Sequence, residues 1–199
     1  MKQHSEPGRI PVAVSARHVH LSQATIERLF GKNYILRPCS ALSQPGQFAA
    51  LETISLVGPQ GRLEHVRVLG PPRTADQVEI SRTDQRILGL EAPLRLSGDL
   101  DSTPGIVLEG PKGRAVLGKG VVWALRHIHM SPSDAEQLNV RDRDVVQVAV
   151  ESEGRPVIFG DVVVRVSPDY RLEFHLDTDE GNAAGVGPGT MARLVSPSV

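Results

Sequence analysis

A chain of 199 residues, 40% of them hydrophobic, is long enough to build one domain or two small ones around ordinary apolar cores. Its 22 basic and 23 acidic side chains nearly cancel, so global charge gives no reason to expect nucleic acid or an anionic membrane surface as a partner. The single cysteine, Cys39, excludes an internal disulfide and a cysteine-based zinc finger, and it fits a reducing compartment. Histidines and carboxylates must therefore hold any bound metal.

The first ten residues, MKQHSEPGRI, contain no apolar core of a signal peptide, and no apolar run approaches the roughly 18 residues of a membrane span. We therefore expect a cytoplasmic protein.

Short β-branched segments separated by Gly and Pro run along most of the chain and predict a mainly β fold, of barrel or sandwich type rather than a helical bundle. In chain order, the predicted strands are Ile10–Ser15, Ala50–Val57, Arg62–Leu69, Val78–Arg82, Ile106–Glu109, Arg114–Leu117, Gly120–Leu125, Val145–Val150, Val157–Val166 and Arg171–Leu176.

Four of the seven histidines lie in two copies of Arg-His-x-His-x-Ser, in the stretches ARHVHLS and LRHIHMS. Each copy follows a predicted strand and ends in a serine, Ser22 or Ser131, that can cap a helix. The second copy also has Pro132 at the first helical position, where a missing N–H costs nothing. The repeat of strand, His-x-His and capped helix indicates an internal duplication.

Each His-x-His pair suits one cation, because alternate side chains of an extended segment share a face. His18 and His20 point together in the first copy, and His127 and His129 in the second. One His-x-His alone is a common accident, whereas two copies in the same repeated context favour a metal site.

The same alternation finds two further candidate ligands, Glu79 and His175, whose sequence neighbours are apolar. Glu79 lies on the face opposite Val78 and Ile80. For each candidate alone, a solvent-facing polar residue on a half-buried sheet is the alternative interpretation.

Four spaced stretches together resemble the motifs of one family, in the family's order. The resemblance is to the phosphate propanoyltransferases, the PduL-type phosphotransacylases of bacterial microcompartments and their free-standing relatives, and it covers nearly the whole chain. The stretches are IPVAVSARHVHLS, PPRTADQVEISRTD, LRHIHMSPSDAEQL and RLEFHLDTDEGNAA.

The resemblance implies two β-barrel domains, each capped by short α-helices and related by the internal duplication. Residues 17–124 would form one barrel. Residues 7–16 would contribute the first strand to the other barrel, built from residues 125–195, with the active site between the two. The resemblance also implies a homodimer.

The resemblance further implies two zinc ions per chain and a catalytic arginine. The implied ligands are His18, His20 and Glu79 for one zinc ion, and His127, His129 and His175 for the other. Arg73 would bind phosphate, since a guanidinium offers planar donors that suit phosphate oxygens. Histidine and carboxylate ligands suit zinc, but cobalt or another divalent ion fits the same positions.

The implied reaction is the reversible transfer of a short acyl group, propanoyl or acetyl, between coenzyme A and inorganic phosphate. Zinc can polarise the thioester carbonyl and stabilise the departing thiolate. Because no Ser-His-Asp set or activated cysteine is evident, we favour direct attack by phosphate over an acyl-enzyme.

Three arginines beside the motifs, Arg17, Arg82 and Arg126, fit either a substrate contact or a structural ion pair, with Asp84 as one candidate partner of Arg82.

Two alternatives to the transferase remain at this point, a metal-stapled, cupin-like ligand-binding module and a thioesterase. Microcompartment members of the family carry an extra amphipathic N-terminal helix, and the roughly ten polar residues before the first strand are too few to form one. We therefore expect a free cytoplasmic enzyme, which leaves the preferred acyl chain open.

Overall fold

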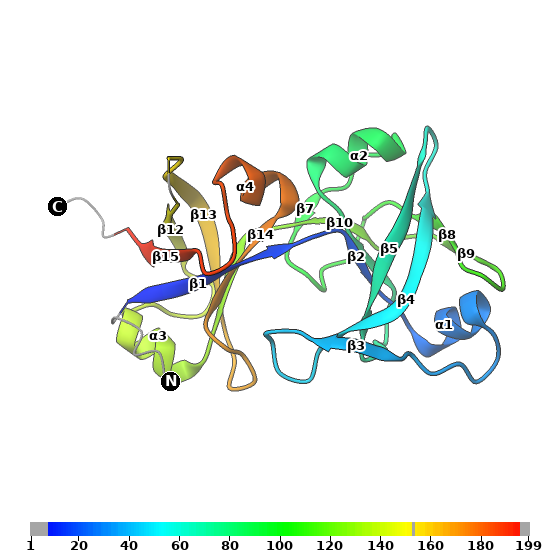
Figure 1. Ribbon diagram of the computed structural model, residues 1–199, viewed down its shortest axis with the longest axis horizontal. Coiled ribbons are helices and arrows are strands. Elements are labelled where there is room, and N and C mark those ends of the chain that lie inside the picture. Colours follow the sequence, from blue (N-terminus) through cyan, green and yellow to red (C-terminus); the bar gives the residue numbers. More distant parts are fainter. Residues whose placement is uncertain (1–7, 153, 196–199) are drawn as a thin grey trace. The chain divides into compact units, whose positions relative to one another are not determined.

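The computed structural model describes residues 8–152 and 154–195. The chain divides into two compact units. Unit 1 combines the described residues up to Ser15 with those from Arg126 onward, and unit 2 spans Ala16–Leu125. Strands dominate both units, which confirms the mainly β fold class (Figure 1). No helix within the described residues is long and apolar enough to cross a bilayer. Residues 1–7, which the prediction about an N-terminal helix concerns, lie outside the described part.

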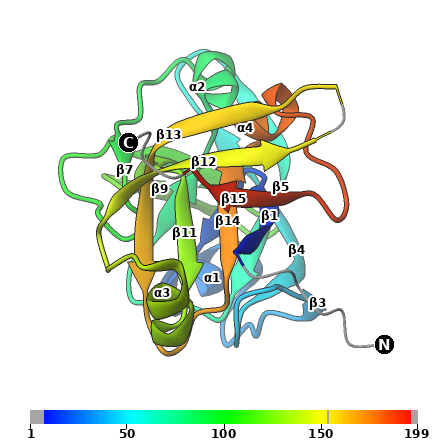
Figure 2. The ribbon, with the colours of Figure 1, turned by 90° about the vertical axis from the view of Figure 1, so that its left-hand side faces the viewer.

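Unit 1 is a closed barrel with the strand order β1-β14-β11-β13-β12-β15, which Figure 2 shows. Its strands are β1 (Arg9–Ser15), β11 (His127–Met130), β12 (Val145–Glu151), β13 (Val157–Val166), β14 (Glu173–Asp177) and β15 (Met191–Leu194), and its helices are α3 (Pro132–Leu138) and α4 (Thr178–Ala183). β1 closes the barrel, because it pairs in parallel with β14, placing Val12 beside Phe174, and antiparallel with β15, placing Ile10 beside Ala192. The N-terminal strand thus joins a domain whose other residues come from the C-terminal third of the chain.

Unit 2 is a nine-stranded sheet curled into a half-barrel, with the order β7-β10-β6-β2-β5-β4-β8-β9 and β3 paired to β4. Its strands are β2 (His18–His20), β3 (Pro38–Ala41), β4 (Phe48–Val57), β5 (Arg62–Gly70), β6 (Gln77–Glu79), β7 (Leu94–Arg95), β8 (Ile106–Glu109), β9 (Arg114–Leu117) and β10 (Val121–Ala124), and its helices are α1 (Gln23–Phe30) and α2 (Arg82–Leu88).

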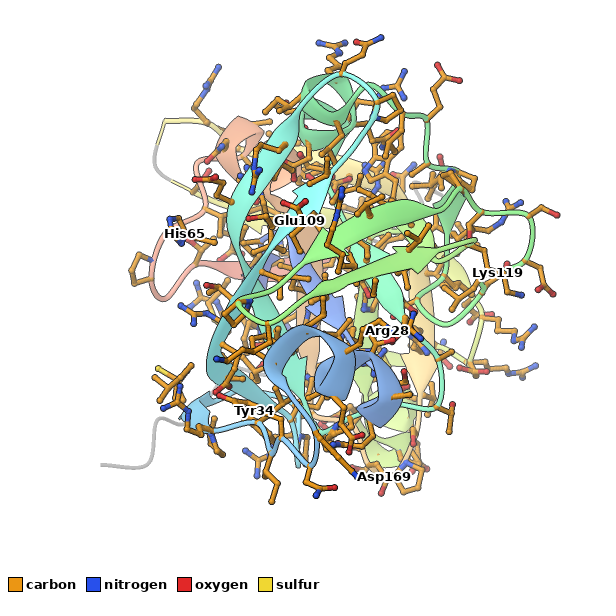
Figure 3. All side chains as sticks on the ribbon, turned by 90° about the vertical axis from the view of Figure 1, so that its right-hand side faces the viewer. Arg28, Tyr34, His65, Glu109, Lys119 and Asp169 are labelled. Atoms are coloured by element: carbon orange, nitrogen blue, oxygen red, sulfur yellow. The ribbon has the colours of Figure 1, made fainter. Side chains whose placement is uncertain are left out.

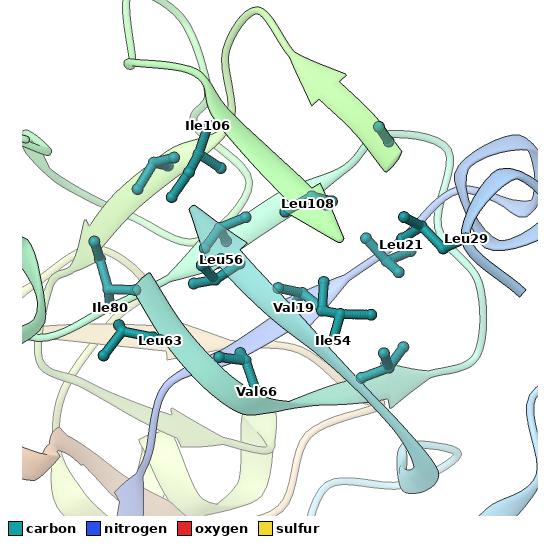
Figure 4. Close-up of a cluster of buried hydrophobic side chains, with 14 of the residues drawn as sticks. Val19, Leu21, Leu29, Ile54, Leu56, Leu63, Val66, Ile80, Ile106 and Leu108 are labelled. Atoms are coloured by element: carbon teal, nitrogen blue, oxygen red, sulfur yellow. The ribbon is translucent and has the colours of Figure 1, made fainter. Parts of the chain in front are cut away.

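The core of unit 2 explains why β2 is held firmly in its place. Figure 4 shows Val19, the residue between the two histidines, among Ile54 and Leu56 of β4 and Leu108 of β8. All four side chains are buried, and burial of each large aliphatic side chain contributes about 1.5–3 kcal/mol. Because successive strand residues point to opposite faces, seating Val19 in this core directs both neighbouring histidines to the other face.

Predicted and observed elements agree closely in the β-branched segments. The predicted strands Ile106–Glu109, Arg114–Leu117 and Val157–Val166 have the same bounds in the structure. Both predicted helix starts are confirmed, since Ser22 caps α1 and Ser131 caps α3.

The predicted strand Val78–Arg82 is wrong at its C-terminal end. Strand β6 stops at Glu79, and Ser81 is the N-cap of α2, which begins at Arg82. A capping box causes this change of direction: the Ser81 hydroxyl accepts from the Asp84 backbone N–H, and the Asp84 carboxylate accepts from the Ser81 N–H. The Ser-x-x-Asp pattern of residues 81–84 is the local sequence signal of this helix start.

A buried carboxylate ties the connection after α1 to the sheet. Glu52 of β4 accepts hydrogen bonds from the Tyr34 hydroxyl at 2.7 Å and from Arg37 Nε at 2.8 Å, and its second oxygen accepts from the Arg37 backbone N–H at 3.1 Å. Tyr34, labelled in Figure 3, comes from the connection between α1 and β3. Burial opposes ionisation of Glu52, yet the hydrogen bonds from Arg37 and Tyr34 outweigh that effect and lower its pKa.

We predict that Glu52→Gln lowers the free energy of unfolding by about 1–3 kcal/mol at neutral pH, since it replaces a charged acceptor with an amide whose N–H groups face other donors. The folded-state pKa of Glu52 is lowered, so its stabilisation is complete above the ordinary carboxyl pKa and is lost as the pH falls through the lowered value. Urea denaturation of both proteins should therefore show the difference shrinking below about pH 4.

The matched control is Glu64→Gln, because Glu64 is an exposed carboxylate that pairs with Arg62 at 3.2 Å. We expect it to change stability by less than about 1 kcal/mol. Equal losses in the two variants would contradict the role assigned to Glu52.

Candidate metal centres

Each His-x-His pair lies on a central strand that has one parallel and one antiparallel neighbour. β2 pairs in parallel with β5 and antiparallel with β6, and β11 pairs in parallel with β13 and antiparallel with β14. The antiparallel register places Glu79 opposite His18 and His175 opposite His127. Each residue that alternation singled out is therefore brought beside a histidine pair.

The first group, in unit 2, consists of His18, His20 and Glu79, all buried, whose candidate ligand atoms lie within 4.8 Å of one another. His18 Nδ1 lies 2.8 Å from the carbonyl oxygen of Ala16. A carbonyl oxygen only accepts, so Nδ1 donates its hydrogen and Nε2 remains as the ligand atom. That Nε2 lies 3.6 Å from Glu79 Oε2, a spacing that suits two ligands of one ion.

Burial and charge set the protonation of the first group. Burial lowers the pKa of His20 to about 2, with further contributions from His18 and Arg73, so this ring is neutral. Burial also disfavours a charged His18, but the neighbouring Glu79 carboxylate outweighs that effect and raises the pKa of His18. Burial opposes ionisation of Glu79 too, and the adjacent His18 overcomes it and lowers the Glu79 pKa. A carboxylate and two imidazoles that carry one exchangeable proton fit a divalent cation, which would take that proton's place.

The second group, in unit 1, consists of His127, His129 and His175, again with candidate ligand atoms within 4.8 Å of one another. The rings of His127 and His175 stack with centroids 5.0 Å apart and planes 3° apart, and His129 meets His175 edge-on at 4.9 Å. Glu173, on the same strand as His175, places Oε2 2.9 Å from His175 Nε2. Three imidazoles backed by a carboxylate are a typical zinc environment.

Each unit contains an ion pair between the arginine before its first histidine and a carboxylate whose identity the sequence did not reveal. Arg17, directly before His18, lies 2.8 Å from the buried carboxylate of Asp84, and Arg126, directly before His127, lies 3.3 Å from Glu180. Asp84 and Glu180 each follow the third candidate ligand by five residues and each occupies the third position of a capping box. Arg17 and Arg126 therefore form structural ion pairs that tie a His-x-His strand to the helix after the third ligand.

Asp84, one candidate partner for a structural ion pair with Arg82, pairs with Arg17 instead. Arg82 Nη1 donates to Gln85 Oε1 at 3.1 Å, within α2. Arg17 is 67 positions from Asp84 in the sequence, so no local sequence pattern could reveal their ion pair.

Arg73 lies beside the first group. It is half-buried in the connection between β5 and β6, and its backbone N–H donates to the Leu21 carbonyl at 2.9 Å. Its charge contributes to lowering the pKa of His20 and opposes the rise in that of His18, as expected for a cation close to both rings.

Asp76 fixes the connection that carries Arg73. Its carboxylate accepts from the Ser22 backbone N–H and from the Thr25 hydroxyl, both at 2.6 Å. These two donors belong to the cap and first turn of α1, directly after His20. The connection is thus held at two points, at Arg73 itself and at Asp76, to the residues that follow the His-x-His strand.

Comparison with known proteins gives one consistent result. The profile of the phosphate propanoyltransferase family matches residues 11–187. A phosphate propanoyltransferase from Thermotoga maritima is 57% identical over 190 residues, which cover 96% of this chain and 90% of the relative. One from Salmonella typhimurium is 56% identical over 189 residues, covering 94% and 90%. One from Klebsiella pneumoniae is 57% identical over 176 residues, covering 88% and 83%.

We predict that metal-free protein binds about two divalent cations per chain, one for each group of candidate ligands. His20→Ala and His129→Ala should each reduce the number to about one, because each removes a ligand from a different group. Titration with Co²⁺, followed by visible absorption and by metal analysis after gel filtration, measures this number. His65→Ala, which changes an exposed histidine outside both groups, should leave it unchanged. Two bound ions in His20→Ala would contradict the assignment.

We also predict that the first group binds cations more weakly as the pH falls. The carboxylate of Glu79 raises the pKa of His18, so a proton competes with the cation at higher pH than for an ordinary imidazole. In His129→Ala, Co²⁺ affinity should therefore fall steadily from about pH 8 to pH 6, with proton release on binding. Calorimetry in two buffers of different ionisation enthalpy measures that release, and an affinity independent of pH would contradict the prediction.

Proposed function

The chain belongs to the phosphate propanoyltransferase family and is an acyltransferase, and from that premise we propose that it exchanges a short acyl group between coenzyme A and inorganic phosphate with the help of bound divalent cations. One observation carries the proposal. The positive charge of Arg73 acts on both imidazoles of a buried set of two imidazoles and a carboxylate, and its backbone N–H donates to Leu21, the residue after His20, so an anion-binding group and a cation-binding group come from neighbouring parts of unit 2.

Both candidate centres fit a divalent cation through the chemistry of their donors. His20 is neutral and His18 presents Nε2, so the first centre offers lone pairs and one negative charge. The second centre offers His127, His129 and His175. Zinc is the ion we propose for both, because imidazole and carboxylate ligands suit it. Cations held there would supply the Lewis acidity that polarises the thioester carbonyl and stabilises the departing thiolate.

The proposed role of Arg73 is to bind and orient phosphate. A guanidinium can donate two parallel hydrogen bonds to two phosphate oxygens, which fixes the directions of the other two oxygens. The Leu21 carbonyl and the Asp76 carboxylate hold the backbone around Arg73, so little freedom is lost when phosphate binds.

Direct attack by phosphate accounts for the whole exchange without a protein nucleophile. A phosphate oxygen forms a bond to the thioester carbon, the carbon–sulfur bond breaks, and its electron pair leaves on the thiolate of coenzyme A. Phosphate is already an anion at neutral pH and attacks without prior deprotonation, and the proton that it carries is lost from the acyl phosphate and ends on the departing thiolate as free coenzyme A. Cys39, the one thiol of the chain, is exposed on β3 and belongs to neither group of candidate ligands in the described residues.

Propanoyl is the acyl group in the names of the relatives, and we propose propanoyl or acetyl for this chain. The homodimer stays a prediction of the family resemblance, and the cytoplasmic location stays a prediction from the sequence.

The test is phosphate-dependent release of free thiol from propanoyl-CoA and acetyl-CoA. We predict that chelation abolishes the release and that Zn²⁺ or Co²⁺ restores it. Arg73→Gln should lower kcat/KM for phosphate about 10–100-fold, since it removes charged hydrogen bonds worth about 1.5–3 kcal/mol. For Arg73→Lys, kcat/KM for phosphate should lie between the values of the wild-type protein and of Arg73→Gln, because lysine keeps the charge but not the planar donors.

Cys39→Ser is the control and should retain full activity. Thiol release that does not require phosphate would indicate a thioesterase instead. A metal-loaded protein that binds acyl-CoA without turnover would indicate a binding module.

A further inference from the structure

Two residues outside the candidate ligand set control which oxygen of Glu79 faces the first centre. Glu79 Oε1 accepts hydrogen bonds from Gln77 Nε2 at 2.5 Å and from the Ser97 hydroxyl at 2.8 Å. Glu79 Oε2 is the oxygen nearest to His18 Nε2. The two oxygens of one carboxylate therefore have separate partners, protein donors for one and the candidate centre for the other.

The donors around Glu79 form a closed hydrogen-bonded triad in which every hydrogen has an acceptor. Gln77 Nε2 carries two hydrogens, which go to Glu79 Oε1 and, at 2.8 Å, to Ser97 Oγ. Ser97 has one hydroxyl hydrogen, which goes to Glu79. The Gly98 backbone N–H donates to Gln77 Oε1 at 3.0 Å, and this contact fixes which end of the amide is oxygen.

Burial makes this triad costly to break. Gln77 is only 2% exposed and lies on β6, two residues before Glu79 and on the same face of the strand. If Glu79 turned to bind a cation through both oxygens, Oε1 would leave two donors, one of them on a fully buried side chain. Buried donors without acceptors are strongly unfavourable, so the triad opposes that rotation.

We propose that Gln77 and Ser97 are positioning residues that restrict Glu79 to binding the cation through Oε2 alone, and that they thereby keep a coordination position open for substrate. The inference rests on the proposed function, since it concerns how the cation of that function is held. Three protein ligands that each contribute one atom leave a fourth position for a reacting group.

Unit 1 has a related arrangement at the equivalent position. Glu173 lies opposite His129 in the strand register, as Gln77 lies opposite His20, and each precedes the third candidate ligand by two residues. Each also contacts that ligand, Glu173 with a carboxylate beside His175 and Gln77 with an amide beside Glu79. The candidate carboxylate ligand Glu79 therefore has a hydrogen-bond donor beside it, and the candidate imidazole ligand His175 has an acceptor beside it. Neighbours of these kinds orient the ligands of a metal ion.

The experiment measures Co²⁺ binding to the full-length chain, with His129→Ala as background so that the first centre alone is observed. Ser97→Ala removes one donor to Glu79, and Ser97→Thr keeps the hydroxyl. We expect Ser97→Ala to raise the Kd for Co²⁺ about 10-fold or more, and Ser97→Thr to keep the Kd close to that of the protein with Ser97. The visible absorption per bound Co²⁺ should also fall in Ser97→Ala, because a second carboxylate oxygen raises the coordination number and weakens these bands.

Two further variants separate positioning from general damage. Ser102→Ala makes the same substitution at an exposed residue of the same connection between β7 and β8, and should change neither Kd nor spectrum. Gln77→Leu removes the other donor and should act in the same direction as Ser97→Ala. The melting temperature of each metal-free variant shows that it is folded.

The outcomes distinguish this inference from the proposed function. If wild-type protein binds Co²⁺ at both centres and turns over acyl-CoA, but Ser97→Ala and Gln77→Leu bind it with unchanged Kd and spectrum, the positioning role is overturned and the proposed function stands. An equal loss of Co²⁺ affinity in Ser97→Ala and Ser102→Ala would also overturn the positioning role. A first centre that binds no Co²⁺ in the His129→Ala background overturns both.

Discussion

The antiparallel register between the His-x-His strand and the strand of the third candidate ligand is the constraint on which each unit depends. It places Glu79 opposite His18 in one unit and His175 opposite His127 in the other. A shift of one residue in either pairing would turn the third ligand to the other face of the sheet. The apolar residues between the ligands prevent that shift, because Val19 and Ile128 are fully buried in the two cores. Hydrophobic packing on one face of the strand therefore fixes the polar geometry on the other.

The same register places supporting residues around each centre. The residue two positions before the third ligand contacts that ligand. The acid five positions after it occupies the third position of a capping box and pairs with the arginine that precedes the first histidine. The ligand strand is thereby tied to its neighbour by backbone pairing and by a charged contact at its end. A rigid setting of this kind suits catalysis, since a cation bound to preorganised ligands needs no rearrangement when charge develops on the substrate.

The two groups of candidate ligands have the same strand pairing but differ in charge. The first group contains a carboxylate and lies beside Arg73, whereas the second contains three imidazoles. The first centre therefore combines a negative ligand with a nearby positive side chain, which suits the binding of phosphate close to a cation. In the second centre the negative charge of Glu173 lies next to the imidazole ligand His175. Identical backbone pairing thus supports two centres of different charge, and we expect different substrate groups to meet them.

The sequence by itself determined the mainly β class, most strand positions, the two capped helices and the pairing of His18 with His20 and of His127 with His129. These features depend on neighbours a few residues apart, through strand alternation, turn residues and helix caps. Alternation also found Glu79 and His175 as candidates, but only strand pairing could bring each one beside its histidines. Tertiary structure alone decided the partners of Arg17 and Arg126 and the contacts of Gln77 and Ser97 with Glu79. Those contacts join residues far apart in the chain, or depend on which oxygen of a side chain faces which neighbour, and neither is encoded in a local pattern.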